Sequence, residues 1–228
     1  MRLFLFDVDG TLVTARGAGR RALGRALAAV YGTAGPIDRY DVRGKTDPRI
    51  VFDLMRAAGL RDADVAARLD ECFDVYVQEL SALIADGHPL EVLPGVTGVV
   101  EALAARRDAV LGLLTGNIER GARAKLSPAG LWPRFRVGAF GSDDADRRRL
   151  PAVACARARA LTGHDFPFER VTIIGDTPLD VDCARACGAR AVVVATGQHG
   201  ATELGACGPD LLFPDLGDVD AVVAALLA

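Results

Sequence analysis

Four short, continuous apolar runs constrain the fold of this chain more than any other feature of its sequence. The runs are LFLF at 3–6, AVLGLLT at 109–115, VTII at 171–174 and RAVVVAT at 190–196. Stretches with helical spacing of apolar residues lie between them. Continuous apolar strands that alternate with helices are typical of a parallel sheet covered by helices on both faces. We therefore predict an α/β core built on a doubly wound parallel sheet.

The strand–helix alternation is interrupted after the first run. Between residues 19 and about 85 the apolar side chains recur only at spacings of three and four, which indicates helices alone. We predict an all-helical cap, residues 16–87, inserted into an α/β catalytic core made of residues 1–15 and 88–228. A segment inserted through two joints can act as a lid over a site.

Length and charge exclude several classes of protein. The chain has 228 residues, enough for one large or two small domains, and its 27 basic and 30 acidic residues give a net charge of -3. There is no basic excess of the kind that nucleic-acid binders carry. No apolar stretch approaches the roughly 20 residues that span a membrane. We expect a cytoplasmic protein with neither nucleic acid nor membrane as a partner; the sequence carries no signal for an oligomeric state.

Polar residues follow three of the apolar runs, at the point where each strand should end. They are Asp7 and Asp9 after the first run, Thr115, Gly116 and Asn117 after the second, and Asp176 and Asp180 after the third. Ligands of open α/β sheets bind outside the carboxyl ends of the strands. Several buried carboxylates need a compensating cation, and all-oxygen ligation favours magnesium. Asp7, Asp9, Asp176 and Asp180 together predict a bound Mg²⁺, with Asp9 supplying its backbone carbonyl if its side chain is used for proton transfer.

The second half of this site is suited to an anion. The hydroxyl of Thr115 and the amides of Gly116 and Asn117 lie where a helix should begin, an arrangement that binds phosphate. An arginine from the cluster at 147–149 adds a positive charge. Asp7 can attack phosphorus, while Asp9 can protonate the leaving oxygen and then activate water.

Three motifs in this order resemble the haloacid dehalogenase superfamily of phosphohydrolases: DVDGTL at 7–12, LLTGN at 113–117 and IIGDTPLD at 173–180. The resemblance implies that Asp7 is the nucleophile, Asp9 the general acid and base, Thr115 a phosphate ligand and Asp176 a metal ligand. Asp180 would then act on the metal ligands or on a metal-bound water, and Gly10 would let the backbone approach the phosphate. The helical insertion resembles the small cap of phosphoglycolate phosphatase-like members.

The chain departs from this family at the third motif, where a lysine is usual. The only lysines are Lys45 and Lys125, and neither lies at the expected position. Arg147 falls where the lysine would, with Arg148 and Arg149 as alternatives. Arginine would keep the charge but change the contact geometry.

The segment RGKTD at 43–47 resembles the substrate-facing loop of the family's cap. Arg43, Lys45 and Thr46 would then touch the part of the substrate that is not transferred. A polar turn with Asp47 as the helix N-cap, before Pro48, explains the same residues equally well.

These observations favour a magnesium-dependent phosphatase that hydrolyses a small phosphomonoester, phosphoglycolate-like or a sugar phosphate, through an aspartyl-phosphate. A phosphomutase would carry the same motifs. A non-enzymatic module that responds to phosphate is a further alternative, although Asp9 argues for turnover and against dehalogenation. Phosphonate hydrolysis is another alternative, in which Lys45 would form a Schiff base with the substrate.

Overall fold

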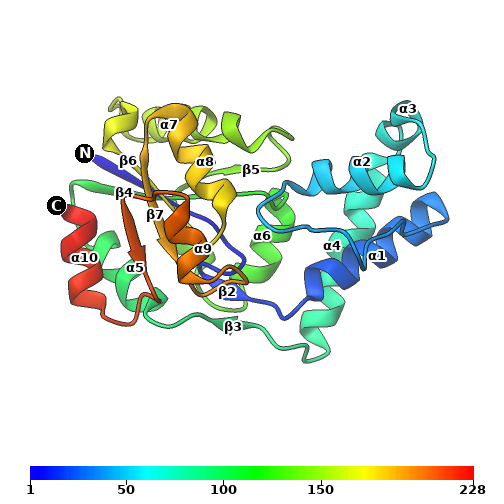
Figure 1. The fold of residues 1–228 in the computed structure, drawn as a ribbon, viewed down its shortest axis with the longest axis horizontal. Coiled ribbons are helices and arrows are strands. Elements are labelled where there is room, and N and C mark those ends of the chain that lie inside the picture. The colour runs from blue at the N-terminus through cyan, green and yellow to red at the C-terminus, as the bar shows by residue number, and fades with distance from the viewer.

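A six-stranded, fully parallel sheet forms the centre of the molecule in a computed structural model that describes all 228 residues (Figure 1). Its strand order is β5-β4-β1-β6-β7-β8. The strands are β1 Arg2–Phe6, β4 Ala109–Thr115, β5 Val137–Phe140, β6 Val171–Gly175, β7 Arg190–Val194 and β8 Leu211–Phe213. The predicted doubly wound α/β core is therefore confirmed, and each of the four apolar runs supplies one of its four inner strands.

Helices cover both faces of the sheet because alternate side chains of each strand point to opposite faces. Phe4 and Phe6 of β1 pack with α5 (Val96–Ala104), α6 (Glu119–Leu126) and α10 (Val219–Leu227). Leu3 and Leu5 of the same strand pack with α7 (Leu150–Thr162), α8 (Pro178–Cys187) and α9 (Ala201–Ala206). Burial on both faces explains why β1 is apolar at every position from Leu3 to Phe6.

The two edge strands, β5 and β8, are absent from the sequence prediction. They have four and three residues, and the residues of β8 are only partly buried. Strands this short cannot carry a long apolar run. An edge strand also has a neighbouring strand on one side only, so fewer of its side chains need to be apolar. The signal that identifies the inner strands is therefore missing.

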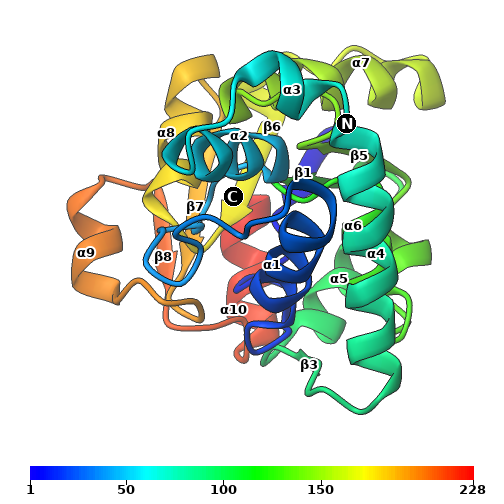
Figure 2. The ribbon, with the colours of Figure 1, turned by 90° about the vertical axis from the view of Figure 1, so that its right-hand side faces the viewer.

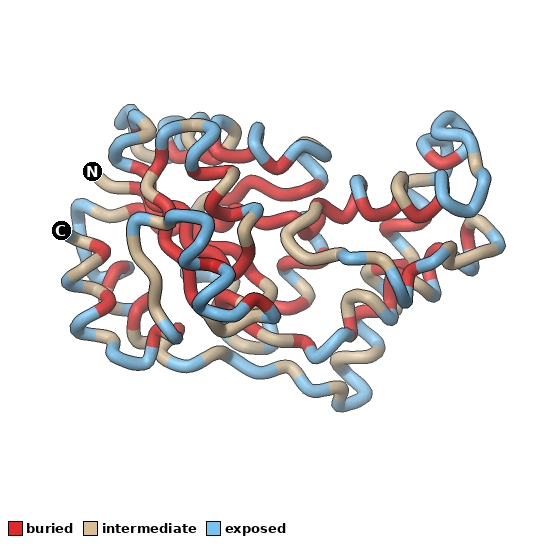
Figure 3. Tube along the Cα trace, in the orientation of Figure 1, coloured by how far each residue is buried: buried red, intermediate tan, exposed pale blue.

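Four helices make up the inserted segment and have an apolar core of their own (Figures 2 and 3). They are α1 Ala18–Tyr31, α2 Asp47–Ala57, α3 Asp62–Ala66 and α4 Leu69–Ala85. We call them the cap helices. They confirm the predicted helical insertion, while the exact division at residues 16–87 stays a prediction.

The insertion leaves and rejoins the core at one place. The two-residue strand β2 (Val13–Thr14) pairs antiparallel with β3 (Glu91–Val92). No helix of the protein combines the length and the apolar character needed to cross a bilayer.

The start of α2 differs from the sequence prediction. Thr46 is its N-cap: the backbone there is extended, and the threonine hydroxyl accepts a hydrogen bond from the amide of Arg49 at 3.4 Å. Asp47 is the first helical residue, so its assignment as the N-cap is wrong. Its carboxylate instead accepts a hydrogen bond at 2.8 Å from the amide of Ile118 in the core.

Candidate active site

The carboxyl ends of three neighbouring strands form the floor of a pocket between the core and the cap helices. Asp7 follows β1, Thr115 ends β4 and Asp176 follows β6, and β1 lies between the other two strands in the sheet. The pocket has a volume of about 570 Å³. Seven residues predicted from the three motifs line it: Asp7, Asp9, Gly10, Thr115, Gly116, Asn117 and Asp176. Asp180 is buried and does not line it.

Arg147 lies at the centre of the buried charges. One of its terminal nitrogens, Nη2, lies 3.3 Å from Asp7 Oδ1 and also donates to Asp180 Oδ1. All three side chains are buried. Arg148 and Arg149 point away from the site: each is exposed, pairing with Asp182 and Asp144 respectively. Of the three candidates, only Arg147 therefore reaches the carboxylates.

Asp180 also stabilises the start of α8, in addition to its contact with Arg147. Its Oδ2 accepts hydrogen bonds from the amide of Thr177 at 3.0 Å and from the hydroxyl of Thr177 at 2.7 Å. This pair forms a capping box, which satisfies two donors at the helix N-terminus. The carboxylate thus holds both the helix that follows Asp176 and the guanidinium of Arg147.

Asp176 lies against backbone that leaves no room for a side chain. A Cβ added to Gly10 would lie 2.3 Å from Asp176 Oδ2, and one added to Gly197 would lie 1.7 Å from the same oxygen. Gly10 also has a positive φ of 79°, which favours glycine. The hydroxyl of Thr11 donates to Asp176 Oδ1 at 3.3 Å. The turn after Asp7 and the loop after β7 therefore hold this carboxylate from two sides.

Three carboxylates converge closely enough to share a cation. One oxygen each of Asp7, Asp176 and Asp180 lies within 4.8 Å of the other two, and all three residues are buried. Burial raises the pKa of Asp7 to about 6, although the charge of Arg147 opposes the shift. Burial, and then the charges of Asp7 and Asp180, raise the pKa of Asp176. One arginine does not offset three buried negative charges, so the donor set fits a hard divalent cation.

The loop after β4 supplies the polar groups of the predicted anion-binding half. Thr115 is fully buried, and its hydroxyl oxygen accepts hydrogen bonds from the amide of Asn117 at 3.3 Å and from Asn117 Nδ2 at 2.9 Å. Asn117 Nδ2 also donates to Asp9 Oδ2 at 2.8 Å. The asparagine side chain therefore connects the predicted phosphate ligand with the predicted acid and base.

Asp9 has a second partner that the sequence prediction missed. Nζ of Lys125, on α6, lies 2.5 Å from Asp9 Oδ2 and 2.6 Å from Asn117 Oδ1. The lysine side chain is 4% exposed, whereas that of Asp9 is 45% exposed. Both residues line the pocket, where Asp9 is half exposed and its cationic partner is almost fully buried.

The loop before α2 packs directly onto the core loops. The amide of Asp47 donates to the carbonyl of Gly116 at 2.7 Å, the hydroxyl of Thr46 donates to the carbonyl of Ala145 at 2.8 Å, and Arg147 Nη1 donates to the carbonyl of Gly44 at 3.1 Å. A Cβ at Gly116 would lie only 2.1 Å from the carbonyl oxygen of Lys45. This cap loop, residues 44–47, therefore closes the pocket above the loop that follows β4.

The predicted substrate contacts of the cap loop differ in their surroundings. Arg43 forms an ion pair with Asp41 at 2.8 Å. The ammonium of Lys45 lies 4.0 Å from the centre of the Tyr40 ring and has no carboxylate partner. Both side chains line the pocket, whereas Thr46 faces Ala145 in the core and does not line it.

Lys125, Asp47 and Gly197 are the residues of the site that the sequence analysis did not predict. None of them belongs to a local sequence motif. Lys125 is one of only two lysines among 27 basic residues, and both lysines line the pocket. This bias toward arginine elsewhere is the one signal that singles Lys125 out. Asp47 and Gly197 carry no such signal, because their roles depend on contacts with distant segments.

The model of the haloacid dehalogenase-like hydrolase family matches residues 1–188. A phosphoglycolate phosphatase of Rhodospirillum rubrum is 31% identical over 94% of this chain and 88% of its own length. A phosphoglycolate phosphatase of Synechococcus elongatus is 30% identical over 100% of this chain and 99% of its own. The structure of CbbY from Rhodobacter sphaeroides in complex with phosphate superposes with a TM-score of 0.71 at 22% identity, covering 96% of each chain. The chain belongs to the haloacid dehalogenase-like hydrolase family.

Proposed function

We propose that this enzyme is a magnesium-dependent phosphatase that hydrolyses a small phosphomonoester of the phosphoglycolate type through an aspartyl-phosphate. One observation carries the proposal: the carboxylate of Asp7, at the end of the central strand, is buried beside Arg147 and two further carboxylates. A carboxylate nucleophile, a fixed positive charge and a cation site at one strand end are the parts that phosphoryl transfer needs.

Mg²⁺ is the cofactor in this proposal. The buried carboxylates of Asp7 and Asp176 would hold it, with the backbone carbonyl of Asp9 as a third protein ligand, and Asp180 would orient Arg147 beside them. When bound, the ion would neutralise charge on the phosphoryl oxygens. The all-oxygen donor set and the raised pKa values of Asp7 and Asp176 support this assignment.

The protein's own residues divide the reaction between them. A carboxylate oxygen of Asp7 attacks phosphorus, and the bond from phosphorus to the leaving oxygen breaks while Asp9 gives that oxygen a proton. Asp9 then takes a proton from a water molecule whose oxygen attacks the aspartyl-phosphate, which releases phosphate and restores Asp7. Thr115, Arg147 and the amides of the loop at 116–117 stabilise charge on the phosphoryl group during both steps.

The pocket charges favour a substrate with a second anionic group. Arg20 and Lys45 line the pocket without forming an ion pair with any carboxylate of the protein. Either cation can bind the carboxylate of a small phosphorylated acid. The two relatives named phosphoglycolate phosphatase support the same class.

Phosphate release from a panel of phosphomonoesters, with and without Mg²⁺, tests the proposal. Phosphoglycolate, sugar phosphates and p-nitrophenyl phosphate belong in the panel, and the Asp7→Asn variant is the control. Magnesium-dependent release that this variant lacks is the expected result. Transfer of phosphate between sugar hydroxyls without release would identify a phosphomutase, and no turnover of any substrate by folded protein would favour a phosphate-responsive binding module.

A further inference from the structure

Lys125 is a buried cation that contacts the carboxylate of Asp9 and the amide oxygen of Asn117, and its charge also opposes the rise that burial gives to the pKa of Asp47. Its Nζ lies 2.5 Å from Asp9 Oδ2 and 2.6 Å from Asn117 Oδ1. No other carboxylate lies within ion-pairing distance of it. The two partners are the predicted acid and base and the residue that holds Thr115.

The position of this lysine has an energetic cost that the fold alone does not explain. Lys125 lies on α6 beside Ala122 and Leu126, which pack in the apolar core. Removing an ammonium group from water costs several kcal/mol, and a carboxylate that is itself 45% exposed offsets only part of that cost. Packing in the apolar core alone would therefore favour an apolar side chain at this position.

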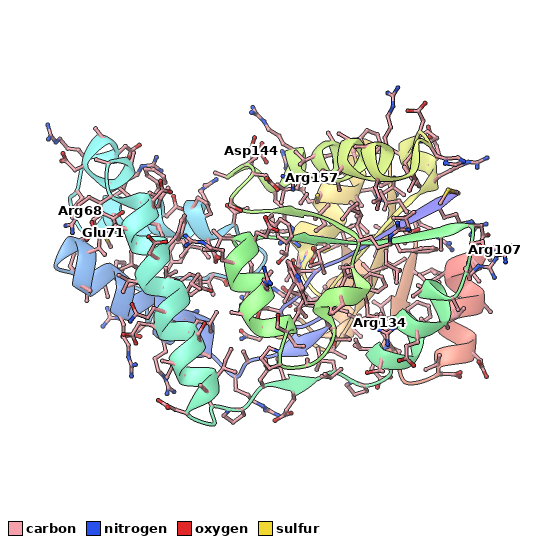
Figure 4. The ribbon with its side chains drawn as sticks, turned by 180° about the vertical axis from the view of Figure 1, so that it is seen from behind. Arg68, Glu71, Arg107, Arg134, Asp144 and Arg157 are labelled. Carbon is pink, nitrogen blue, oxygen red and sulfur yellow. The ribbon has the colours of Figure 1, made fainter.

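The cap helices shield the ammonium from solvent. A Cβ added to Gly19 of α1 would lie 3.4 Å from Lys125 Nζ and 3.7 Å from the hydroxyl of Tyr76 on α4. Helices α4 and α6 also pack side by side at the boundary between cap and core (Figure 4). Because water is excluded on this side, the contact with Asp9 is less screened than a surface ion pair.

We infer that Lys125 is a positioning residue for Asp9: together with Asn117 it holds the Asp9 carboxylate where it can reach the leaving oxygen and the attacking water. The inference rests on the proposed function, because it takes Asp9 as the acid and base. Asp9 Oδ2 accepts from both Lys125 Nζ and Asn117 Nδ2, which leaves Oδ1 free to face the substrate. Two donors on one oxygen fix the rotation of the Asp9 side chain, although that side chain is 45% exposed.

The test compares two leaving groups in the Lys125→Met variant. Departure of p-nitrophenolate needs no proton, whereas departure of an alkoxide such as that of phosphoglycolate does. Single-turnover measurements give the rate at which each substrate phosphorylates the enzyme. We expect the rate with phosphoglycolate to fall on the order of tenfold to a hundredfold, within the range that general acid catalysis contributes, and the rate with p-nitrophenyl phosphate to change less than about threefold.

Steady-state constants and stability complete the comparison. For phosphoglycolate kcat should fall with KM nearly unchanged. The melting temperature should fall only slightly, because Asp9, the carboxylate left without its partner, is 45% exposed and can be solvated. Arg123→Met, which removes an exposed cation from the same helix, is the matched control and should behave as wild type. Lys125→Arg should recover part of the lost rate, and Lys125→Gln, which keeps a donor, replaces the methionine variant if that one does not fold.

The outcomes separate this inference from the proposed function. Equal losses with both leaving groups, or no loss with either, would overturn the positioning role while leaving the phosphatase assignment intact. If the wild-type enzyme acquires no phosphoryl group from any substrate, on Asp7 or elsewhere, both the positioning role and the proposed mechanism would be overturned.

Discussion

Arg147 Nη2 lies 3.3 Å from Asp7 Oδ1, so the only buried arginine of the core loops pairs with the residue that we propose as the nucleophile. The same guanidinium joins Asp180 on α8 to the carbonyl of Gly44 in the cap loop. Arg147 therefore connects the nucleophile, the last motif and the cap through one planar group. A lysine has only one nitrogen to offer and would not make all these contacts at once.

Replacement of Arg147 by methionine should destabilise the enzyme and stop turnover. Removing one partner of a buried ion pair costs about 3–5 kcal/mol, since the other charge stays buried without compensation. Urea unfolding measures this loss. Arg148→Met removes an exposed pair with Asp182 and should cost no more than about 1 kcal/mol. Similar losses in the two variants would contradict the central position of Arg147.

Asp7→Asn should reduce turnover on the order of 10³-fold or more, because removal of a covalent nucleophile leaves only binding and electrostatic effects. Mass spectrometry of the acid-quenched enzyme should find a phosphoryl group on the peptide that contains Asp7 in wild type and none in the variant. A phosphorylated variant would place the nucleophile elsewhere.

Magnesium should stabilise the protein far more at pH 8 than at pH 5. Burial raises the pKa of Asp7 to about 6 in the folded, metal-free state, and it raises that of Asp176 as well. For such groups the favourable contribution to stability is complete below the unfolded-state pKa of about 4 and is lost as the pH rises through about 6. A cation bound to the ionised carboxylates offsets that loss.

Thermal unfolding with Mg²⁺ and with a chelator, at both pH values, measures the difference. Asp176→Asn should remove most of the magnesium effect at pH 8. An equal rise in melting temperature at pH 5 and pH 8 would mean that these carboxylates do not form the metal site.

Gly116→Ala should lower activity by moving the cap loop, because the added Cβ would lie 2.1 Å from the carbonyl oxygen of Lys45. The core should still fold, so circular dichroism should match wild type while KM rises and kcat falls. Gly24→Ala is the matched control. Gly24 lies inside α1, and its added Cβ would meet only the side chain of Ile37, at an ordinary contact distance of 3.6 Å. Inside a helix, alanine is more stable than glycine by about 0.5–1 kcal/mol. Loss of activity in the control would show that the effect is not specific to the loop contact.

The residues that the sequence predicts well are those whose position follows from the sheet. Asp7, Thr115 and Asp176 could be brought together from their order alone, because parallel strands end at one edge and each apolar run marks a strand. Lys125 could not, because the side of α6 that faces Asp9 depends on how the helix packs on the sheet and against α4. The N-cap of α2 was misplaced by one residue, because the carboxylate of Asp47 binds the amide of Ile118 in the core instead of an amide of its own helix.

The pairing of β2 with β3 means that the two places where the chain passes between core and cap lie side by side. Val13 lies opposite Val92 and Thr14 opposite Glu91, and the ring of His88 contacts the carbonyl of Ala15 at 2.9 Å. The two crossings of the chain are therefore already neighbours, and a tight turn of a few residues would join them with little loss of entropy. Everything between them can be exchanged as one segment, by mutation or recombination, without any change to the strand ends that we propose as the catalytic site.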